Sequence, residues 1–255
     1  MDSLPIVVFR CRGRYGHFRK PYSNVSPLSY PFPPRTAIAG LLGAILGIGK
    51  EGVAETFNHD NARIAVEMDA KVKTITHVTN FRQDSSGDVN YSIKRPKKGG
   101  VPKKPPKNVP ARNVSTQIPM ELLRNPSYLI YANLNSGMDE LMSRIETKRY
   151  VYTPCMGLSE FLVEVEYVSV GTAEPLEPGE FDVSTVVCKD DCYLILDRLN
   201  PEEGHNIHEL KVPYLGTAER TFTYRRYLVD MASKPLPVRM KSGAYQYENK
   251  IIAFL

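Results

Sequence analysis

The chain has 255 residues, enough for one large domain or two small ones, and 42% of them are hydrophobic, so a core can form. The formal net charge is +5 but uneven: residues 1–112 carry 19 lysines and arginines against 8 acids, and residues 113–255 carry 14 against 20. This composition excludes wholesale disorder and makes the amino-terminal part the expected binder of a polyanion.

No targeting or membrane segment is expected. The first apolar run, residues 6–9, ends at Arg10 and is too short for a secretory signal. The longest apolar run, residues 37–49, holds four glycines and falls short of the ~20 residues that a membrane span needs. The four cysteines are then expected to be free thiols in a reducing compartment, which predicts a cytoplasmic protein.

Residues 6–12 predict a strand, because a run of apolar residues is followed by alternating apolar and basic residues. Val8, Arg10 and Arg12 fall on one face, so that face should meet something acidic while the apolar face covers a core. From residue 3 to residue 50 no Asp or Glu occurs against seven Lys and Arg, whereas solvated faces normally mix signs. This favours a polyanion-binding face over the alternative, a solvated basic surface.

Residues 36–48 predict a glycine-studded helix, with Thr36 as its N-cap after two prolines. Glycines at three- and four-residue spacing share one helix face and allow close approach of another backbone, either a sheet or a nucleic acid. The segment lacks the Lys-Ser/Thr ending of a phosphate-binding loop, which excludes that class of NTPase. Residues 62–80 alternate and predict one long half-buried strand, bent near its middle.

Residues 94–112 carry eight lysines and arginines and no acid, and their prolines and glycines oppose both a helix and a central strand. A long insertion of this kind predicts a basic loop, or the tip of a protruding hairpin, that contacts nucleic acid. A solvated tail and a localisation signal are the alternatives.

Beyond the insertion, strands are expected at 127–134 and 161–170, with a helix at 138–148. The resulting order of strand, helix, strand, basic insertion, strand, helix, strand resembles a split βαβ, ferredoxin-like sandwich. The predicted fold class is therefore α+β, with an RRM-type βαββαβ domain over residues 1–172 and a thumb-like insertion around 80–112. Such a fold offers an open sheet face to single-stranded RNA.

The remaining residues, 173–255, predict a smaller and mostly β domain. A linker is expected at 173–182, and short strands are expected at 183–188, 193–196, 221–228 and 251–254.

Cys188-x3-Cys192 followed by His205-x2-His208 resembles zinc-finger spacing, but the histidine spacing is one residue short and a proline and a glycine oppose a helix there. We favour a β-hairpin whose turn is flanked by the two thiols, with the two histidines in a loop. No metal and no cofactor is therefore expected, although zinc is left open.

Hydrolase signatures such as Gly-x-Ser-x-Gly and His-Glu-x-x-His do not occur. His17, beside Tyr15 and Lys20, is a candidate base for a metal-free ribonuclease, since such chemistry needs only a side chain near the 2′-hydroxyl. A phosphate- or base-contacting role and a structural role are the alternatives for His17. His77, in the middle of a strand, is expected to be structural.

Two stretches carry a family resemblance. The first is FRCRGRYGHFRKPY at residues 9–22, running on to YPFPPRTAIAGLLGAILG at residues 30–47, and the second is RYVYTPCMGLSEF at residues 149–161. In this order they resemble the Cas-five family of the repeat-associated mysterious protein (RAMP) superfamily, over roughly residues 5–170.

The resemblance implies a subunit at the foot of the type I CRISPR surveillance complex, Cascade, that binds and caps the 5′ handle of CRISPR RNA in antiviral defence. Its implied partners are the CRISPR RNA, the backbone subunit, the large subunit and, through the assembled complex, target DNA. A protruding thumb in this family packs over the RNA, and residues 80–112 occupy its place.

One branch of the family, type I-C, also cuts repeat RNA with a Tyr, a Lys and an adjacent His. This sequence has no Lys-His dipeptide, so we expect a non-catalytic clamp that looks most like type I-B. The alternatives are a metal-independent endoribonuclease centred on His17 and Tyr15, and a generic RNA-recognition module outside CRISPR biology.

The predicted RNA-contacting set joins the basic amino-terminal segment to the insertion. It consists of Arg10, Arg12, Arg14, Tyr15, His17, Arg19, Lys20, Arg35, Lys94, Arg95, Lys97, Lys98, Lys103, Lys104, Lys107 and Arg112. No catalytic residue and no metal ligand is assigned.

Overall fold

A computed structural model of the chain describes residues 3–23, 26–82, 115–199, 202, 204–217 and 221–255. The helices are α1 Arg35–Leu46, α2 Lys50–Thr56 and α3 Met138–Thr147, and two 3-10 turns are η1 Lys189–Asp191 and η2 Leu196–Arg198. The strands are β1 Leu4–Gly13, β2 Tyr15–Gly16, β3 Phe18–Arg19, β4 Ser29–Tyr30, β5 Ala62–Met68, β6 Thr74–Arg82, β7 Ser115–Arg124, β8 Ser127–Leu134, β9 Val163–Pro175, β10 Gly179–Val183, β11 Val187–Cys188, β12 Cys192–Leu194, β13 Ile207–Gly216, β14 Phe222–Asp230, β15 Leu236–Met240, β16 Ala244–Tyr247 and β17 Lys250–Ala253.

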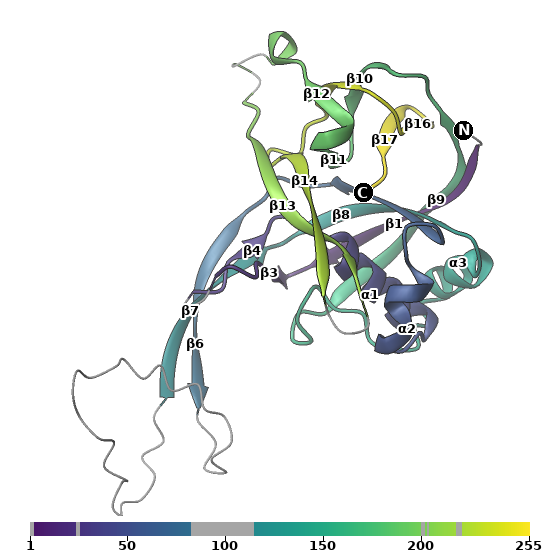
Figure 1. Cartoon of the computed structure of the whole chain (residues 1–255). Helices are drawn as coiled ribbons and strands as arrows, with labels where there is room; N and C mark the ends of the chain where they lie inside the picture. Colours follow the sequence, from purple (N-terminus) through teal and green to yellow (C-terminus); the bar gives the residue numbers. More distant parts are fainter. Residues whose placement is uncertain (1–2, 24–25, 83–114, 200–201, 203, 218–220) are drawn as a thin grey trace, which may run out of the picture.

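One large curled sheet runs through the molecule, in the order β12-β15-β10-β17-β16-β9-β1-β8-β5 (Figure 1). Within its β9-β1-β8-β5 part every neighbouring pair is antiparallel. Helices α1 and α3 pack on one face of this part, where α1 buries Ile38, Leu42 and Ile45. The chain is therefore a mixed α/β protein with a large sheet and few helices.

The expected alternation along β1 is confirmed. Val7, Phe9 and Cys11 are buried in the core beneath the helices, whereas Val8 belongs to a second cluster on the opposite face. Two further predictions hold closely, because β8 spans the expected residues 127–134 and α3 ends one residue before the expected helix end. Strong local periodicity was enough to place these elements.

The sheet face that was expected to be open to RNA is largely covered, so that prediction is wrong for this part of the molecule. Tyr245, Tyr247 and Ile252, from the carboxy-terminal strands β16 and β17, pack against Val8 and Tyr131. All eight residues of β8 are buried in consequence. The cause is the curl of the sheet, which brings its far strands back over β1 and β8.

The long strand expected at 62–80 is two strands in different sheets. β5 ends at Met68 and pairs with β8, whereas β6 begins at Thr74 and pairs with β7. Between them, the Asp69 amide donates to the Ser127 carbonyl and the Val72 amide donates to the Met231 carbonyl. The alternating pattern continues through this connection, so periodicity alone did not reveal the break.

Helix α1 begins one residue before the predicted cap. Pro34, not Thr36, occupies the N-cap position and gives no side-chain hydrogen bond there. At the other end Gly47 adopts a left-handed φ of 82° and its amide donates to the Gly43 carbonyl. Among the described residues no single helix is long and apolar enough to cross a membrane, and α1 and α2 pass that test only as a pair bent by 115°.

The carboxy-terminal third departs most from expectation. Much of the predicted linker at 173–182 is strand, since β9 runs to Pro175 and β10 begins at Gly179. Strands β13, β15 and β16 were not predicted, and neither was β7 earlier in the chain. Because β9 passes through residue 172 without a break, the division into two domains at that point stays a prediction.

The hairpin expected around the two neighbouring thiols is also wrong. Cys188 and Cys192 do flank the η1 turn, but β11 pairs with β14 and β12 pairs with β15, in different sheets. His208 lies in β13 and not in a loop. All four cysteines of the chain are free thiols, as expected.

Candidate nucleic-acid interface

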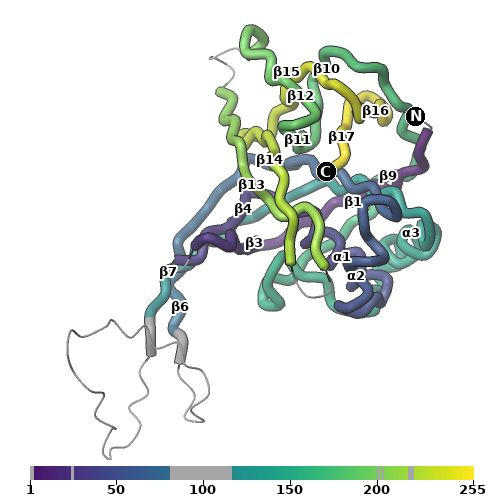
Figure 2. The backbone as a smooth tube through the Cα atoms, in the orientation of Figure 1, coloured from purple at the N-terminus to yellow at the C-terminus, as the bar shows by residue number. Residues whose placement is uncertain are grey.

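Strands β6 and β7 form an antiparallel ribbon that projects from the body of the protein, and β2 extends its base (Figures 1 and 2). Residues 83–114, which lie between these strands in sequence, are outside the described residues. The predicted contacts in the basic insertion fall there. They are Lys94, Arg95, Lys97, Lys98, Lys103, Lys104, Lys107 and Arg112.

At the base of the ribbon, three strands align an aromatic ring with two cations. Tyr15 of β2 pairs with Arg124 of β7, and the Arg124 amide donates to the Lys73 carbonyl across a distance of 2.8 Å. Residues directly opposite one another on neighbouring strands project from the same face. Tyr15, Arg124 and Lys73 therefore form one row across the ribbon base.

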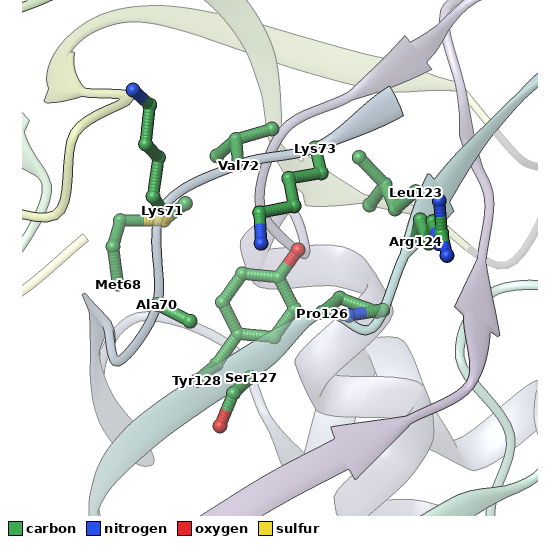
Figure 3. A pocket seen from close by; sticks show the side chains of 10 residues that line it. All are labelled: Met68, Ala70, Lys71, Val72, Lys73, Leu123, Arg124, Pro126, Ser127 and Tyr128. Carbon is green, nitrogen blue, oxygen red and sulfur yellow. The ribbon is translucent and has the colours of Figure 1, made fainter. Parts of the chain in front are cut away.

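Two further cations complete this group. The Arg14 guanidinium lies 5.7 Å from the centre of the Tyr15 ring, and the Arg14 carbonyl accepts from the Asn125 amide. Lys71 lines a small pocket together with Lys73 and Arg124 (Figure 3). We call Arg14, Tyr15, Lys71, Lys73 and Arg124 the ribbon-base cluster.

The four cations of the ribbon-base cluster are exposed and carry no ion pair within the described part of the chain. Tyr15 is half-buried, and its ring centre is 6.3 Å from that of Phe161. Cations beside exposed aromatic faces are the combination that single-stranded nucleic acids bind, since phosphates meet the charge and bases stack on the rings.

Arg10 and Arg12 are placed differently, because each faces carboxylates of the same chain. Arg10 Nε lies 2.9 Å from Asp69 Oδ2 and its Nη1 lies 3.4 Å from Glu166, while Arg12 Nη2 lies 3.1 Å from Glu166 and 3.7 Å from Glu164. The hydrogen bond to Asp69 raises the pKa of Arg10. The acidic partner expected for this face of β1 is thus supplied largely by strand β9.

His17 is buried, with 2% of its surface exposed. Its Nδ1 lies 2.8 Å from the Glu121 carbonyl oxygen, which can only accept, so Nδ1 carries the proton and the neutral ring leaves Nε2 without one. Nε2 is buried and has no hydrogen-bond partner among the residues that the structure describes. Burial, with a smaller effect of Arg19, lowers the pKa of His17. The structure therefore shows His17 as a buried side chain that is hydrogen-bonded to β7.

Arg35 is also buried, with 2% of its surface exposed. Its guanidinium donates to three main-chain carbonyls, those of Phe57, Asn58 and Ala62, at 2.7–2.8 Å. Tyr214 stacks nearby, with its ring centre 5.6 Å from the guanidinium carbon. Arg35 therefore holds the chain between α2 and β5, and its charge is not presented to a ligand at the surface.

Arg19 is the last residue of β3, and Lys20 follows it. Arg19 is exposed, whereas Lys20 is half-buried with its Nζ 5.7 Å from the centre of the Tyr30 ring. Neither has an ion pair with any residue that the structure describes.

The two stretches that carried the family resemblance meet in space. The His17 amide donates to the Met156 carbonyl at 3.1 Å, and Gly157, at a φ of 91°, lies against the His17 carbonyl. No β-carbon fits at Gly157 without overlapping that carbonyl. The second stretch thus supports the loop that holds Tyr15 and the neighbouring cations.

The possible zinc ligands are engaged elsewhere. His205 Nδ1 lies 2.5 Å from Asp230 Oδ2, and His208 Nε2 lies 2.9 Å from Asn206 Oδ1. Among the residues that the structure describes, no group of three His, Cys, Asp or Glu side chains is placed to hold a metal ion.

Sequence reasoning missed Lys71, Lys73 and Arg124. A signal for the lysines was present, because residues 70–83 contain no acid, but the pattern was interpreted only as a half-buried strand. Arg124 gave no such signal, since its place beside Lys73 depends on the pairing of β6 with β7.

Comparisons with known proteins bear on this arrangement. The model of one family, described as CRISPR-associated protein (Cas_Cas5), matches residues 6–179. No curated protein sequence matches the chain.

Two solved structures illustrate the structural likeness. A CRISPR protein from Archaeoglobus fulgidus is similar with a TM-score of 0.53 and 12% identity, over 98% of each chain. A chain of a CRISPR RNA-guided surveillance complex is similar with a TM-score of 0.44 and 14% identity, over 91% of each chain. At these identities the first likeness concerns the fold alone.

Proposed function

Because the chain belongs to the Cas-five family of CRISPR-associated proteins, we propose that it is a non-catalytic subunit of a type I CRISPR surveillance complex (Cascade). In this role it binds and caps the 5′ handle of CRISPR RNA. It also links the backbone subunit to the large subunit, in antiviral defence in the cytoplasm. Type I-B remains the proposed subtype.

The observation that carries RNA binding is the ribbon-base cluster. It has four exposed cations that form no ion pair within the described part of the chain, and one of them, Arg14, lies beside the half-buried Tyr15 ring, at the base of a ribbon that leaves the body of the protein. Free cations bind phosphates with release of counterions, whereas paired ones such as Arg10 have their charge largely compensated. The proposed contact set is therefore this cluster with Arg19 and Lys20, together with the basic insertion.

The proposed thumb and domain assignment rest on topology. If β1, β5, β8 and β9 are counted one to four along the chain, their order in the sheet is four-one-three-two, and all neighbours are antiparallel. Helix α1 connects the first strand to the second, and α3 connects the third to the fourth. A split βαβ, ferredoxin-like domain has this arrangement. The β6–β7 ribbon is inserted between its second and third strands, which supports its assignment as the thumb.

Absence of catalysis is proposed on the state of His17. A general base must come within hydrogen-bond reach of the proton it removes. His17 is buried, its protonated nitrogen donates to the Glu121 carbonyl, and its other nitrogen is buried without a hydrogen-bond partner among the described residues. Tyr15 then lacks an accessible histidine partner in its vicinity, which disfavours the metal-independent endoribonuclease.

One experiment tests both statements. Purified protein is incubated with labelled repeat RNA in EDTA, and the mixture is analysed by gel shift and for cleavage. We expect salt-sensitive binding without cleavage. A cut at one phosphate, abolished in His17→Ala, would establish the endoribonuclease instead.

The cluster is tested with a charge-matched pair of double variants. Lys73→Gln/Arg124→Gln removes two phosphate contacts, so the slope of log affinity against log salt should fall by about 1.4 on single-stranded RNA. Lys50→Gln/Lys148→Gln removes two exposed cations that lie outside the cluster and should leave the slope unchanged. Equal effects of the two variants would mean that only net charge matters and would refute the site.

A further inference from the structure

A second surface combines exposed rings with two lysines, where the β3–β4 segment meets the β13–β14 hairpin. Tyr22 is 62% exposed in the β3–β4 connection, and Tyr224 is 36% exposed on β14. Lys20 precedes Tyr22 by two residues, and Lys211 lies beside the ring of Tyr224. We call these four residues the tyrosine strip.

The buried Tyr30 joins the two halves of the strip. Its ring centre is 5.7 Å from Lys20 Nζ, and its hydroxyl donates to the Lys211 carbonyl at 2.8 Å. Lys211 Nζ in turn lies 5.5 Å from the centre of the Tyr224 ring. Burial raises the pKa of Tyr30, and the phenols of Tyr22 and Tyr224 add to the effect.

Neither Lys20 nor Lys211 forms an ion pair with the residues that the structure describes. Glu209, two residues from Lys211, is held by Lys189 at 3.3 Å and by Arg226 at 3.4 Å. The Glu121 carboxylate accepts from the amide of Ser29, the neighbour of Tyr30, at 2.9 Å.

We propose that the tyrosine strip is a second contact for single-stranded RNA, in which bases stack on Tyr22 and Tyr224 while Lys20 and Lys211 meet the adjacent phosphates. Exposed rings alternating with cations suit a nucleic acid strand, because every base has a face to stack and every nucleotide a charge to neutralise. A protein partner would instead favour a continuous apolar centre depleted of lysine.

This inference rests on the proposed RNA binding, and it gives the β13–β14 hairpin a function although the carboxy-terminal part of the chain is net acidic. The RNA would then run from the ribbon base past Arg19 to the hairpin. The handle would contact both parts of the chain instead of the amino-terminal part alone.

The test separates stacking from charge. Tyr22→Ala/Tyr224→Ala should weaken binding of labelled 5′-handle RNA by about 5- to 150-fold for each base that loses its ring, without a change in the salt slope. Tyr22→Phe/Tyr224→Phe keeps the rings and should bind like the wild type. Lys20→Gln/Lys211→Gln should lower the salt slope by about 1.4.

The matched control is Tyr193→Ala, because Tyr193 is 61% exposed and also carries a lysine, Lys241, 4.3 Å from its ring centre. Its affinity for RNA should equal that of the wild type. Circular dichroism and thermal unfolding of every variant check that the fold is retained.

The outcomes distinguish this inference from the proposed function. If the wild type binds the RNA and responds to Lys73→Gln/Arg124→Gln, but the tyrosine variants bind normally, the strip is refuted and the ribbon-base cluster stands. Loss of association with another subunit of the complex at unchanged RNA affinity would assign the strip to a protein partner, which also refutes it. A wild type that binds no RNA refutes the proposed function itself.

Discussion

Gly157 lies against the main-chain carbonyl of His17, so the loop after α3 and the connection between β2 and β3 are in direct backbone contact. The hydrogen bond from the His17 amide to the Met156 carbonyl fixes the same contact. Through this contact, a glycine that carries no functional group positions Tyr15 and its neighbouring cations.

Substitution of Gly157 by alanine should therefore destabilise the protein. The left-handed φ of 91° alone makes a side chain unfavourable by about 1–3 kcal/mol, and the added β-carbon would also overlap the His17 carbonyl. We expect Gly157→Ala to lower the free energy of unfolding by at least about 2 kcal/mol, measured by urea denaturation.

Gly40 provides the matched control. It lies on the exposed side of α1, and a β-carbon there would meet nothing within 4 Å. Gly40→Ala should leave stability unchanged or raise it by about 0.5–1 kcal/mol, because alanine restricts the unfolded chain and favours the helix. Similar losses in both variants would contradict the packing argument.

Arg35→Lys is expected to destabilise the fold although it keeps the charge. A lysine cannot reproduce the fork that reaches the carbonyls of Phe57, Asn58 and Ala62, and each buried carbonyl left without a donor costs about 1–3 kcal/mol. Denaturation curves should show a loss of about 2–4 kcal/mol. The salt slope of RNA binding should not change below the melting temperature.

In contrast to Arg35→Lys, Arg19→Gln is expected to change RNA binding and to leave stability almost unchanged. Arg19 is exposed and unpaired within the described residues, so its removal should alter stability by less than about 0.5 kcal/mol. The salt slope of RNA binding should fall by about 0.7. An unchanged slope would remove Arg19 from the contact set.

Stability should depend on pH through His17. Burial holds the pKa of His17 below its ordinary value, about 6.5, so the unfolded chain takes up this proton before the folded chain does. The contribution of neutral His17 to the free energy of unfolding is therefore fully present above about pH 6.5. It is lost as the pH falls from there through the lower pKa of the folded state. The slope it adds is at most about 1.4 kcal/mol per pH unit.

The check is urea denaturation of wild type and His17→Gln between pH 7.5 and pH 5. The wild type should lose more free energy of unfolding over this range than the variant, which has no titrating group at residue 17. Parallel curves would contradict a neutral, buried His17.

Substitutions of Arg10 and Lys73 are expected to have different effects, one on the stability of the fold and the other on RNA binding. Arg10→Gln breaks the partly exposed pair with Asp69, which should lower stability by about 1 kcal/mol and leave the salt slope of RNA binding unchanged. Lys73→Gln should do the reverse, with a slope lower by about 0.7 and no loss of stability. A lower slope in Arg10→Gln would restore Arg10 to the RNA-contacting set.

Local pattern was sufficient for the elements with strong periodicity, such as β1, β8 and α3, and for the family, through the two motif stretches. It failed where the pattern continued across a break, as between Met68 and Thr74, and where short strands such as β15 and β16 depend on neighbours for their pairing. Short strands have few local determinants, so tertiary pairing decides them.

Composition and order of residues established that the positive charge lies in the amino-terminal part and that this part should meet a polyanion. They did not establish which cations are free. That depends on long-range neighbours: Glu166 and Asp69 compensate Arg10, main-chain carbonyls surround Arg35, and β6–β7 pairing brings Arg124 beside Lys73. Burial and ion pairing arise between residues far apart in the chain, so only the tertiary structure separates a cation that binds a ligand from one that holds the fold.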